Sequence, residues 1–142
     1  MIQAISTITV PKIAFYIGAS FGAGNYGMSG YAYEPDFLFS WVNARTGVMA
    51  GASAAKTMRM VAEVRAARKG ETVDEAAAQK QEDFITELFT KQESAFYTSG
   101  RVLDHGVIDP RDTRRVLGFT LETISEARAR SLRPNSFGVA RP

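Results

Sequence analysis

A glycine-rich segment near the start of the chain carries the residues with the clearest chemical potential. Residues 20–28 read Ser-Phe-Gly-Ala-Gly-Asn-Tyr-Gly-Met and follow an apolar run at residues 12–18. The small side chains of Gly22, Ala23 and Gly24 let a ligand approach the backbone closely. Where such a turn opens a helix, successive N–H groups point outward and attract negative charge. The pattern therefore predicts an oxyanion hole, which needs no acid, base or metal from the chain.

The same turn matches the serine-nucleophile pattern G-x-S-x-G over residues 18–22. Ser20 would be the nucleophile, and the single histidine, His105, would be the base, with Asp104 or Asp109 as the third member of a triad. Asp104 directly precedes His105, which leaves little room for the orienting hydrogen bond, and the hydrolase fold usually needs a longer chain. This interpretation is disfavoured, and His105 is expected to be an ordinary loop residue.

A further match is the dinucleotide pattern G-x-G-x-x-G over residues 22–27. That fingerprint expects an acidic residue about 20 positions later, at the end of the next strand. Asn43, Ala44 and Arg45 occupy the region instead, and Arg45 suits the 2′-phosphate of NADP. The bulky Tyr26 lies where helix and sheet should approach closely. An NADP-binding, dehydrogenase-like domain stays open as an alternative, as does a tight turn that binds nothing.

The composition excludes several kinds of site. The chain has 142 residues, no cysteine and one histidine, so disulfides, thiol catalysis and a metal site of several histidines are excluded. No stretch reaches the roughly 18 apolar residues of a membrane span, and no signal-peptide pattern is present. A soluble intracellular protein is expected. The formal charge of +2 is weak evidence for a nucleic-acid partner. The later basic residues indicate solvated helix faces or a surface for anionic partners.

Strands and helices alternate in the elements that must position the turn. The predicted strands, which are apolar and rich in β-formers, are residues 12–18, 37–43 and 47–50. The predicted helices are residues 51–68, 73–94, 95–105 and 109–129, and the tail is expected to be extended. The first strand should be buried on both faces, as in parallel sheets. The fold class is α/β in one domain over residues 1–142, with a sheet too small for so many helices and therefore incomplete.

The sequence resembles the carboxyltransferase (β) subunit of biotin-dependent acyl-CoA carboxylases, in particular the methylcrotonyl-CoA and geranyl-CoA types. The resemblance is strong over residues 11–28, over Trp-Val-Asn-Ala-Arg at residues 41–45, and over Gly-Val-Ile-Asp-Pro-Arg-Asp-Thr-Arg-Arg-Val-Leu-Gly at residues 106–118. It is looser over residues 56–95, as expected of surface helices. The resemblance implies a crotonase/ClpP-like fold, in which this chain corresponds to the final part of the C-terminal carboxyltransferase domain.

The family's subunits are several times longer, so the resemblance implies further partners. The first is the N-terminal carboxyltransferase half, on the same or a separate chain; a truncated gene, an internal start or a split subunit would explain the short length. A biotin carboxylase and biotin carrier subunit, an acyl-CoA and further copies in a dimer or hexamer are also implied. Neither nucleic acid nor a membrane is expected. The implied location is cytoplasmic in a bacterium, or the mitochondrial matrix in a eukaryote.

The resemblance also implies roles for single residues. In the family, carboxybiotin on a partner protein delivers CO₂ to the enolate of an acyl-CoA, and backbone amides of the second half bind the ureido oxygen of biotin. By position these amides belong to Ala23 and Gly24. Phe21, Gly22 and Asn25 are expected to contact the biotin. Tyr26 is expected to border the acyl group, and no metal is implied in this chain.

One position departs from the family. His105 stands where the family commonly has an aspartate, so a catalytic histidine is disfavoured further. Besides the carboxyltransferase and the NADP-binding domain, a non-catalytic binding or assembly module for a CoA-type or nucleotide ligand stays open.

Overall fold

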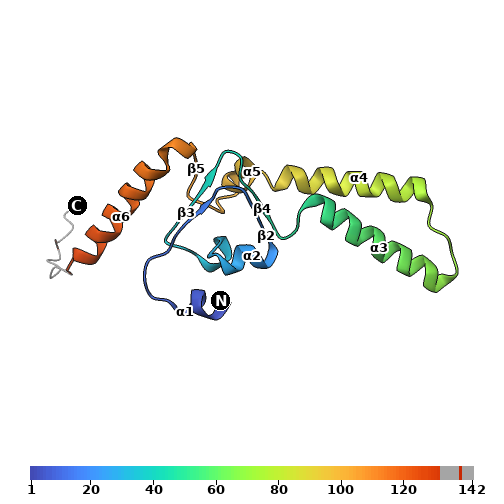
Figure 1. Ribbon diagram of the computed structural model, residues 1–142, viewed down its shortest axis with the longest axis horizontal. Helices are drawn as coiled ribbons and strands as arrows, with labels where there is room; N and C mark the ends of the chain where they lie inside the picture. Colours follow the sequence, from blue (N-terminus) through green and yellow to red (C-terminus); the bar gives the residue numbers. More distant parts are fainter. Residues whose placement is uncertain (132–137, 139–142) are drawn as a thin grey trace.

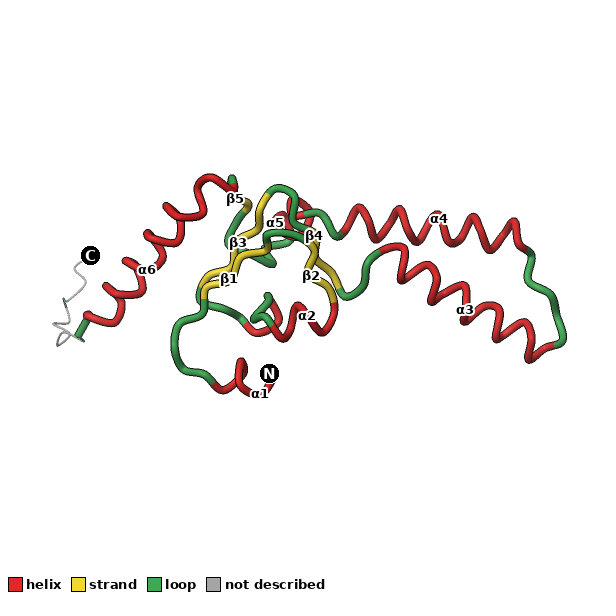
Figure 2. The backbone as a smooth tube through the Cα atoms, in the orientation of Figure 1, coloured by secondary structure: helices red, strands yellow, loops and turns green. Residues whose placement is uncertain are grey.

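Two small parallel sheets form the centre of the protein, in a computed structural model that describes residues 1–131 and 138 (Figure 2). The first sheet has the order β1-β3-β5 and contains β1 (Ile13–Tyr16), β3 (Phe37–Trp41) and β5 (Val107–Ile108). The second pairs β2 (Ala19–Phe21) with β4 (Arg45–Gly47). Every pairing between these strands is parallel. The α/β class predicted from the sequence is confirmed.

The strand boundaries differ from the predicted ones. Residues 12–18 contain a shorter strand, and β2 lies partly inside the segment predicted as a turn. β1 is half-buried along most of its length and buried only at Tyr16, so the expected burial on both faces is wrong for this chain. The third predicted strand begins at Arg45 rather than at residue 47. The tail predicted to be extended lies mostly outside the described residues.

The hydrophobic core is small. Tyr16, Leu38, Ala44 and Ala95 form a buried cluster where β1 and β3 meet α5 (Ala95–Gly100). Many large apolar side chains remain exposed on the helices that leave this centre. The sheets are therefore open, and much of the chain's apolar surface has no cover among the described residues.

Two helical arms project from the sheets in opposite directions (Figure 1). One is a hairpin of α3 (Gly51–Lys69) and α4 (Glu75–Gln92), and the other is α6 (Thr113–Ala129). The short helices α1 (Ile2–Thr7) and α2 (Gly22–Gly27) contact each other below the sheets, and 3₁₀ turns form at Tyr31–Tyr33 and Pro110–Asp112. Within the described part of the chain, no helix combines the length and apolarity that crossing a membrane requires.

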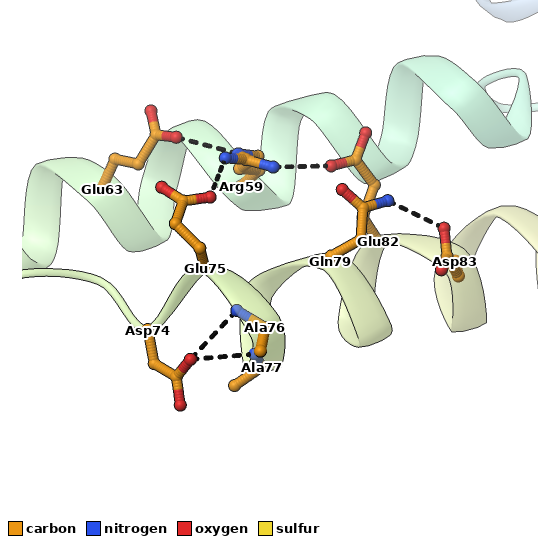
Figure 3. A network of polar contacts seen from close by, with 9 residues as sticks. All are labelled: Arg59, Glu63, Asp74, Glu75, Ala76, Ala77, Gln79, Glu82 and Asp83. Atoms are coloured by element: carbon orange, nitrogen blue, oxygen red, sulfur yellow. Dashed lines mark hydrogen bonds and ion pairs between the residues drawn. The ribbon is translucent and has the colours of Figure 1, made fainter.

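Charged contacts hold the two helices of the hairpin together (Figure 3). Arg59 of α3 donates to Glu63 of the same helix at 3.0 Å, and to Glu75 and Glu82 of α4 at 2.5 and 3.4 Å. These carboxylates, Glu63 foremost, raise the pKa of Arg59 above its ordinary value. Asp74 caps α4 with its side chain. The hairpin is thus a defined element although it projects away from the core.

The start of α6 is anchored to the first sheet. Asp109 accepts a hydrogen bond from the N–H of Arg111 at 2.9 Å, so it caps the 3₁₀ turn rather than α6, which begins later than predicted. Hydrogen bonds from Arg111 hold the pKa of Asp109 at about 2. The indole N–H of Trp41 donates to Thr113 Oγ1 at 2.9 Å, which ties the end of β3 to the first residue of α6.

A buried carboxylate lies where β4 meets the junction of α4 and α5. Glu93 is 5% exposed, and its Oε1 lies 3.5 Å from Nη1 of Arg45, whose side chain is 60% exposed. Its Oε2 has no hydrogen-bond partner among the described residues. The N–H of Thr46 donates to the Glu93 carbonyl at 2.9 Å, so this junction helps to hold β4 in place.

We expect Gly51→Ala to destabilise the protein by about 1–3 kcal/mol through overpacking. A Cβ at residue 51 would lie 2.9 Å from the carbonyl oxygen of Thr86 and 3.3 Å from Cβ of Phe89. Gly118→Ala is the matched control, because nothing lies within 4 Å of its Cβ and alanine favours a helix. Thermal unfolding followed by circular dichroism measures both. An unchanged melting temperature for Gly51→Ala would contradict this packing of α3 on α4.

We expect Arg45→Ala to lower the free energy of unfolding by about 1–2 kcal/mol, because it leaves the buried Glu93 carboxylate without a counter-charge. Adding Glu93→Gln keeps the shape, removes the charge and should recover most of that loss. Urea denaturation of the wild type, both single variants and the double variant measures the coupling. A double variant as unstable as Arg45→Ala would mean that the ion pair is not the cause.

Candidate functional site

The turn from β2 into α2 requires glycine at its first helical residue. Phe21 ends β2 in an extended conformation, and Gly22 follows with φ +54°. A Cβ at residue 22 would lie 3.2 Å from the carbonyl oxygen of Val48. Left-handed backbone and close approach both favour a residue without a side chain. Gly22 therefore lets the chain bend sharply into α2 beside the segment that follows β4.

The exposed first turn of α2 presents backbone donors. Ala23 and Gly24 are exposed, and they lie in the turn whose N–H groups have no carbonyl before them in the helix. No side chain caps this helix. Donors of this kind hold an oxyanion or a polarised carbonyl oxygen well. Chemically, the site offers hydrogen bonds to negative charge and leaves proton transfer to other groups.

The two aromatic residues at the turn have different surroundings. Phe21 is half-buried, and its ring lies 3.6 Å from the position that a Cβ on Gly47 would take. Tyr26 is 46% exposed, and its ring meets that of Tyr33 edge to face at 5.9 Å between centroids. Phe21 therefore packs over the end of β4, whereas Tyr26 keeps a free face next to the exposed amides.

The side chain of Asn25 points into the protein. It is 4% exposed, and its amide nitrogen donates to Tyr16, Thr46 and Ser20. Sequence reasoning did not find Tyr16 or Thr46 as members of the site. The only signal in the sequence was one polar side chain in each of two short segments, and such a signal is weak. Contact of Asn25 with a biotin stays a prediction, and its side-chain amide is already engaged.

The groups proposed for a serine triad have other partners. His105 Nδ1 accepts the N–H of Leu38 at 3.0 Å, and its ring packs against both Phe37 and Phe39 of β3. Asp104 accepts hydrogen bonds from the Ser40 hydroxyl and from the N–H of Gly106. Ser20 lies in β2 of the second sheet, and its Oγ accepts a hydrogen bond from Asn25 of α2. The structure thus gives His105 a packing role and does not support the hydrolase interpretation.

The dinucleotide interpretation does not fit the topology. β2, the strand that leads into the glycine-rich helix, pairs only with β4 in a sheet of two strands among the described residues. A dinucleotide-binding fold places this strand inside a larger open sheet. The side chain of Arg45 faces Glu93 in an ion pair, which occupies the group expected to bind a 2′-phosphate.

A cavity of about 610 Å³ lies between the end of β4, the base of the hairpin and α5. Its lining is mainly apolar and includes Val48, Met49, Met58 and Phe89. The carbonyl of Val48 is also the neighbour of Gly22, so the cavity borders the turn. In residues 1–131 and 138, no three carboxylate or imidazole groups gather in a way that would hold a metal ion.

Comparisons with known proteins show the family of the chain. The family model of the carboxyl transferase domain matches residues 1–138. A probable biotin-dependent acyl-coenzyme A carboxylase beta2 subunit of Mycobacterium tuberculosis is 43% identical over 99% of this chain and 26% of its own length. The mitochondrial methylcrotonoyl-CoA carboxylase beta chain of Arabidopsis thaliana is 43% identical over 99% of this chain and 24% of its own.

A solved structure extends the comparison to the fold. The beta subunit of P. aeruginosa geranyl-CoA carboxylase superposes on this chain with a TM-score of 0.83 and 42% identity. The match covers 98% of this chain and 26% of that one. The chain thus spans about a quarter of the length of these relatives. The resemblance in sequence and the crotonase-like fold are both confirmed, and the chain belongs to the carboxyl transferase domain family.

Proposed function

We propose that this chain forms the biotin-side half-site of the carboxyltransferase in a biotin-dependent acyl-CoA carboxylase. The observation that carries the proposal is the exposed, uncapped first turn of α2, in a chain that matches the carboxyl transferase family over residues 1–138. The relatives are named as carboxylases of methylcrotonyl-CoA and geranyl-CoA, and these names favour a substrate with a branched or unsaturated acyl group. The reaction transfers CO₂ from carboxybiotin to a carbon of that acyl group.

The chemistry of the donors fits biotin. The ureido oxygen of biotin is a strong acceptor, and Ala23 and Gly24 are consecutive exposed residues in the first turn of α2, where N–H groups lack carbonyl partners within the helix. Their role is to stabilise negative charge on that oxygen as the bond to the carboxyl group breaks, which is the role of an oxyanion hole. When bound, carboxybiotin supplies the CO₂. Gly22 allows the backbone to turn so that these two amides face outward.

The neighbouring side chains supply contact surface. We assign Phe21 to packing near the biotin, since its ring lies beside the end of β4 next to the turn. We assign Tyr26 to the border of the acyl group, since it is partly exposed one residue beyond the buried Asn25. We assign neither side chain a role in proton transfer, and the base at the acyl carbon is left to the other components of the reaction.

The remaining machinery belongs to partners. The proposal requires an N-terminal carboxyltransferase half to bind the acyl-CoA, and a biotin carboxylase and carrier subunit to deliver the carboxybiotin. Apolar side chains on the projecting helices, among them Met60, Phe84 and Phe119, are more than 60% exposed and suit contacts with such partners or with further copies of the subunit. The names of the relatives favour the mitochondrial matrix in a eukaryote, or the cytoplasm of a bacterium.

We expect Ala23→Pro to lower kcat of carboxyl transfer by about 10²- to 10³-fold, the usual cost of removing one oxyanion-hole donor. Proline fits the first turn of a helix, so the substitution removes the N–H without breaking α2. Ala23→Gly is the matched control, because it keeps the N–H. The assay combines this chain with the rest of the carboxyltransferase subunit, including its N-terminal half, and with carboxylated biotin and methylcrotonyl-CoA, and it quantifies the carboxylated acyl-CoA.

Two outcomes would contradict the proposal at different levels. Undiminished turnover by Ala23→Pro would remove the oxyanion role from this amide. No transfer by the assembled wild-type protein with any of methylcrotonyl-, geranyl-, propionyl- or acetyl-CoA would favour a non-catalytic binding or assembly module.

A further inference from the structure

The buried amide of Asn25 joins the two sheets beneath the candidate site. Its Nδ2 lies 2.9 Å from the Tyr16 hydroxyl of β1, 2.9 Å from Thr46 Oγ1 of β4 and 3.2 Å from Ser20 Oγ of β2. The two N–H groups of one amide thus serve three acceptors, with at least one N–H shared. A single side chain from α2 therefore contacts one strand of the first sheet and both strands of the second.

The groups around Asn25 complete this network. The Tyr16 hydroxyl also accepts the N–H of Tyr31 at 3.1 Å, and Thr46 Oγ1 donates to the Ser20 carbonyl at 2.9 Å. The backbone carbonyl of Asn25 accepts the N–H of Gly30 at 2.9 Å. Burial raises the pKa of Tyr16 above its ordinary value. Buried polar groups that are well satisfied in this way fix one arrangement of their neighbours.

Gly30 is shaped to the Asn25 side chain. Its φ of −69° and ψ of −176° suit any residue, so backbone conformation does not require glycine here. Space does: a Cβ on Gly30 would lie 1.8 Å from Asn25 Oδ1 and 2.7 Å from the Tyr16 hydroxyl. The absence of a side chain at Gly30 thus provides the space that Asn25 Oδ1 occupies, which is a separate observation from the hydrogen bonds of Asn25 Nδ2.

The helix needs such an anchor. α2 has six residues and no side-chain cap, and its buried residues are Asn25 and Gly27. Helices this short are not stable on their own, and tertiary contacts must fix their orientation. Gly27 has no side chain to hold. Asn25 is therefore the buried side chain that ties α2 to both sheets, beside the contacts of α2 with α1 and with Tyr33.

We propose that Asn25 is a positioning residue for carboxyl transfer, which holds the N–H groups of Ala23 and Gly24 in their working direction and does not itself touch the biotin. This inference rests on the proposed function of those amides. It assigns a role to a side chain that a sequence pattern alone would place against the ligand. Small displacements of an aligned donor lower turnover steeply, by as much as about 10²-fold for 1 Å.

The test uses the assembled carboxylase, with this chain, the rest of the carboxyltransferase subunit including its N-terminal half, the carboxylated carrier and methylcrotonyl-CoA. Asn25→Ala should lower kcat about 10- to 100-fold per folded enzyme, while KM for the acyl-CoA stays within about twofold, since only the oxyanion donors are misplaced. Asn43→Ala is the matched control: Asn43 is exposed and donates only a long hydrogen bond of 3.3 Å to the Ile17 carbonyl. It should leave both constants unchanged.

A second variant reaches the same amide from the other side. Gly30→Ala pushes a methyl group against Asn25 Oδ1 and should reproduce the loss in kcat without touching Asn25. When Gly30→Ala is combined with Asn25→Ala, the side-chain oxygen that would clash most closely with the new methyl group is absent. The double variant should therefore lose less than the product of the two single losses.

The outcomes separate this inference from the function on which it rests. If Ala23→Pro abolishes transfer while Asn25→Ala and Gly30→Ala keep wild-type kcat, positioning by Asn25 is overturned and the half-site stands. If kcat falls only in proportion to the folded fraction measured by circular dichroism, Asn25 is merely structural and the inference is overturned as well. If the wild-type assembly transfers no carboxyl group, both proposals fail.

Discussion

A shared hydrogen-bond network links two sheets that have no common ladder. The first sheet contributes Tyr16 and the second contributes Ser20 and Thr46, and the amide of Asn25 bonds to all three. Because the apolar core consists of few residues, this polar contact carries more of the internal order than it would in a larger domain. In our proposal the position of α2 depends on this network, while Gly22 provides the bend after β2.

The same arrangement explains why the amides of the turn are free. Asparagine at the N-cap position commonly uses its side chain to satisfy the first N–H groups of a helix. Here Asn25 lies inside the helix and directs its amide away from those groups, while the N-cap residue is Phe21, which has no acceptor to offer. Ala23 and Gly24 are thus left with donors that a ligand can satisfy. The local sequence thus leaves the first N–H groups of α2 without a side-chain cap, which makes the helix less stable in isolation.

The sequence could predict the turn because its signal is local. Gly22, Ala23 and Gly24 are adjacent, and the conformational freedom of glycine next to a β-rich run indicates a strand-to-helix bend. The inward direction of Asn25 could not be read in this way, because its partners lie 5, 9 and 21 positions away on three strands. β2 was missed for a related reason: a strand of three residues has too little pattern to stand out. The long helices, which repeat their signal over several turns, were placed correctly apart from their ends.

The exposure of the amides bears on why a half-site would need the rest of the subunit. An N–H group in water exchanges one hydrogen bond for another when it meets an oxyanion, so its net gain is small. The same donor in a site closed to water is worth far more, because the local dielectric is low and the dipoles are already aligned. In this chain Ala23 and Gly24 face outward from an open pair of sheets. In our proposal Asn25 supplies their alignment from within, whereas the exclusion of water has to come from the surface that covers them.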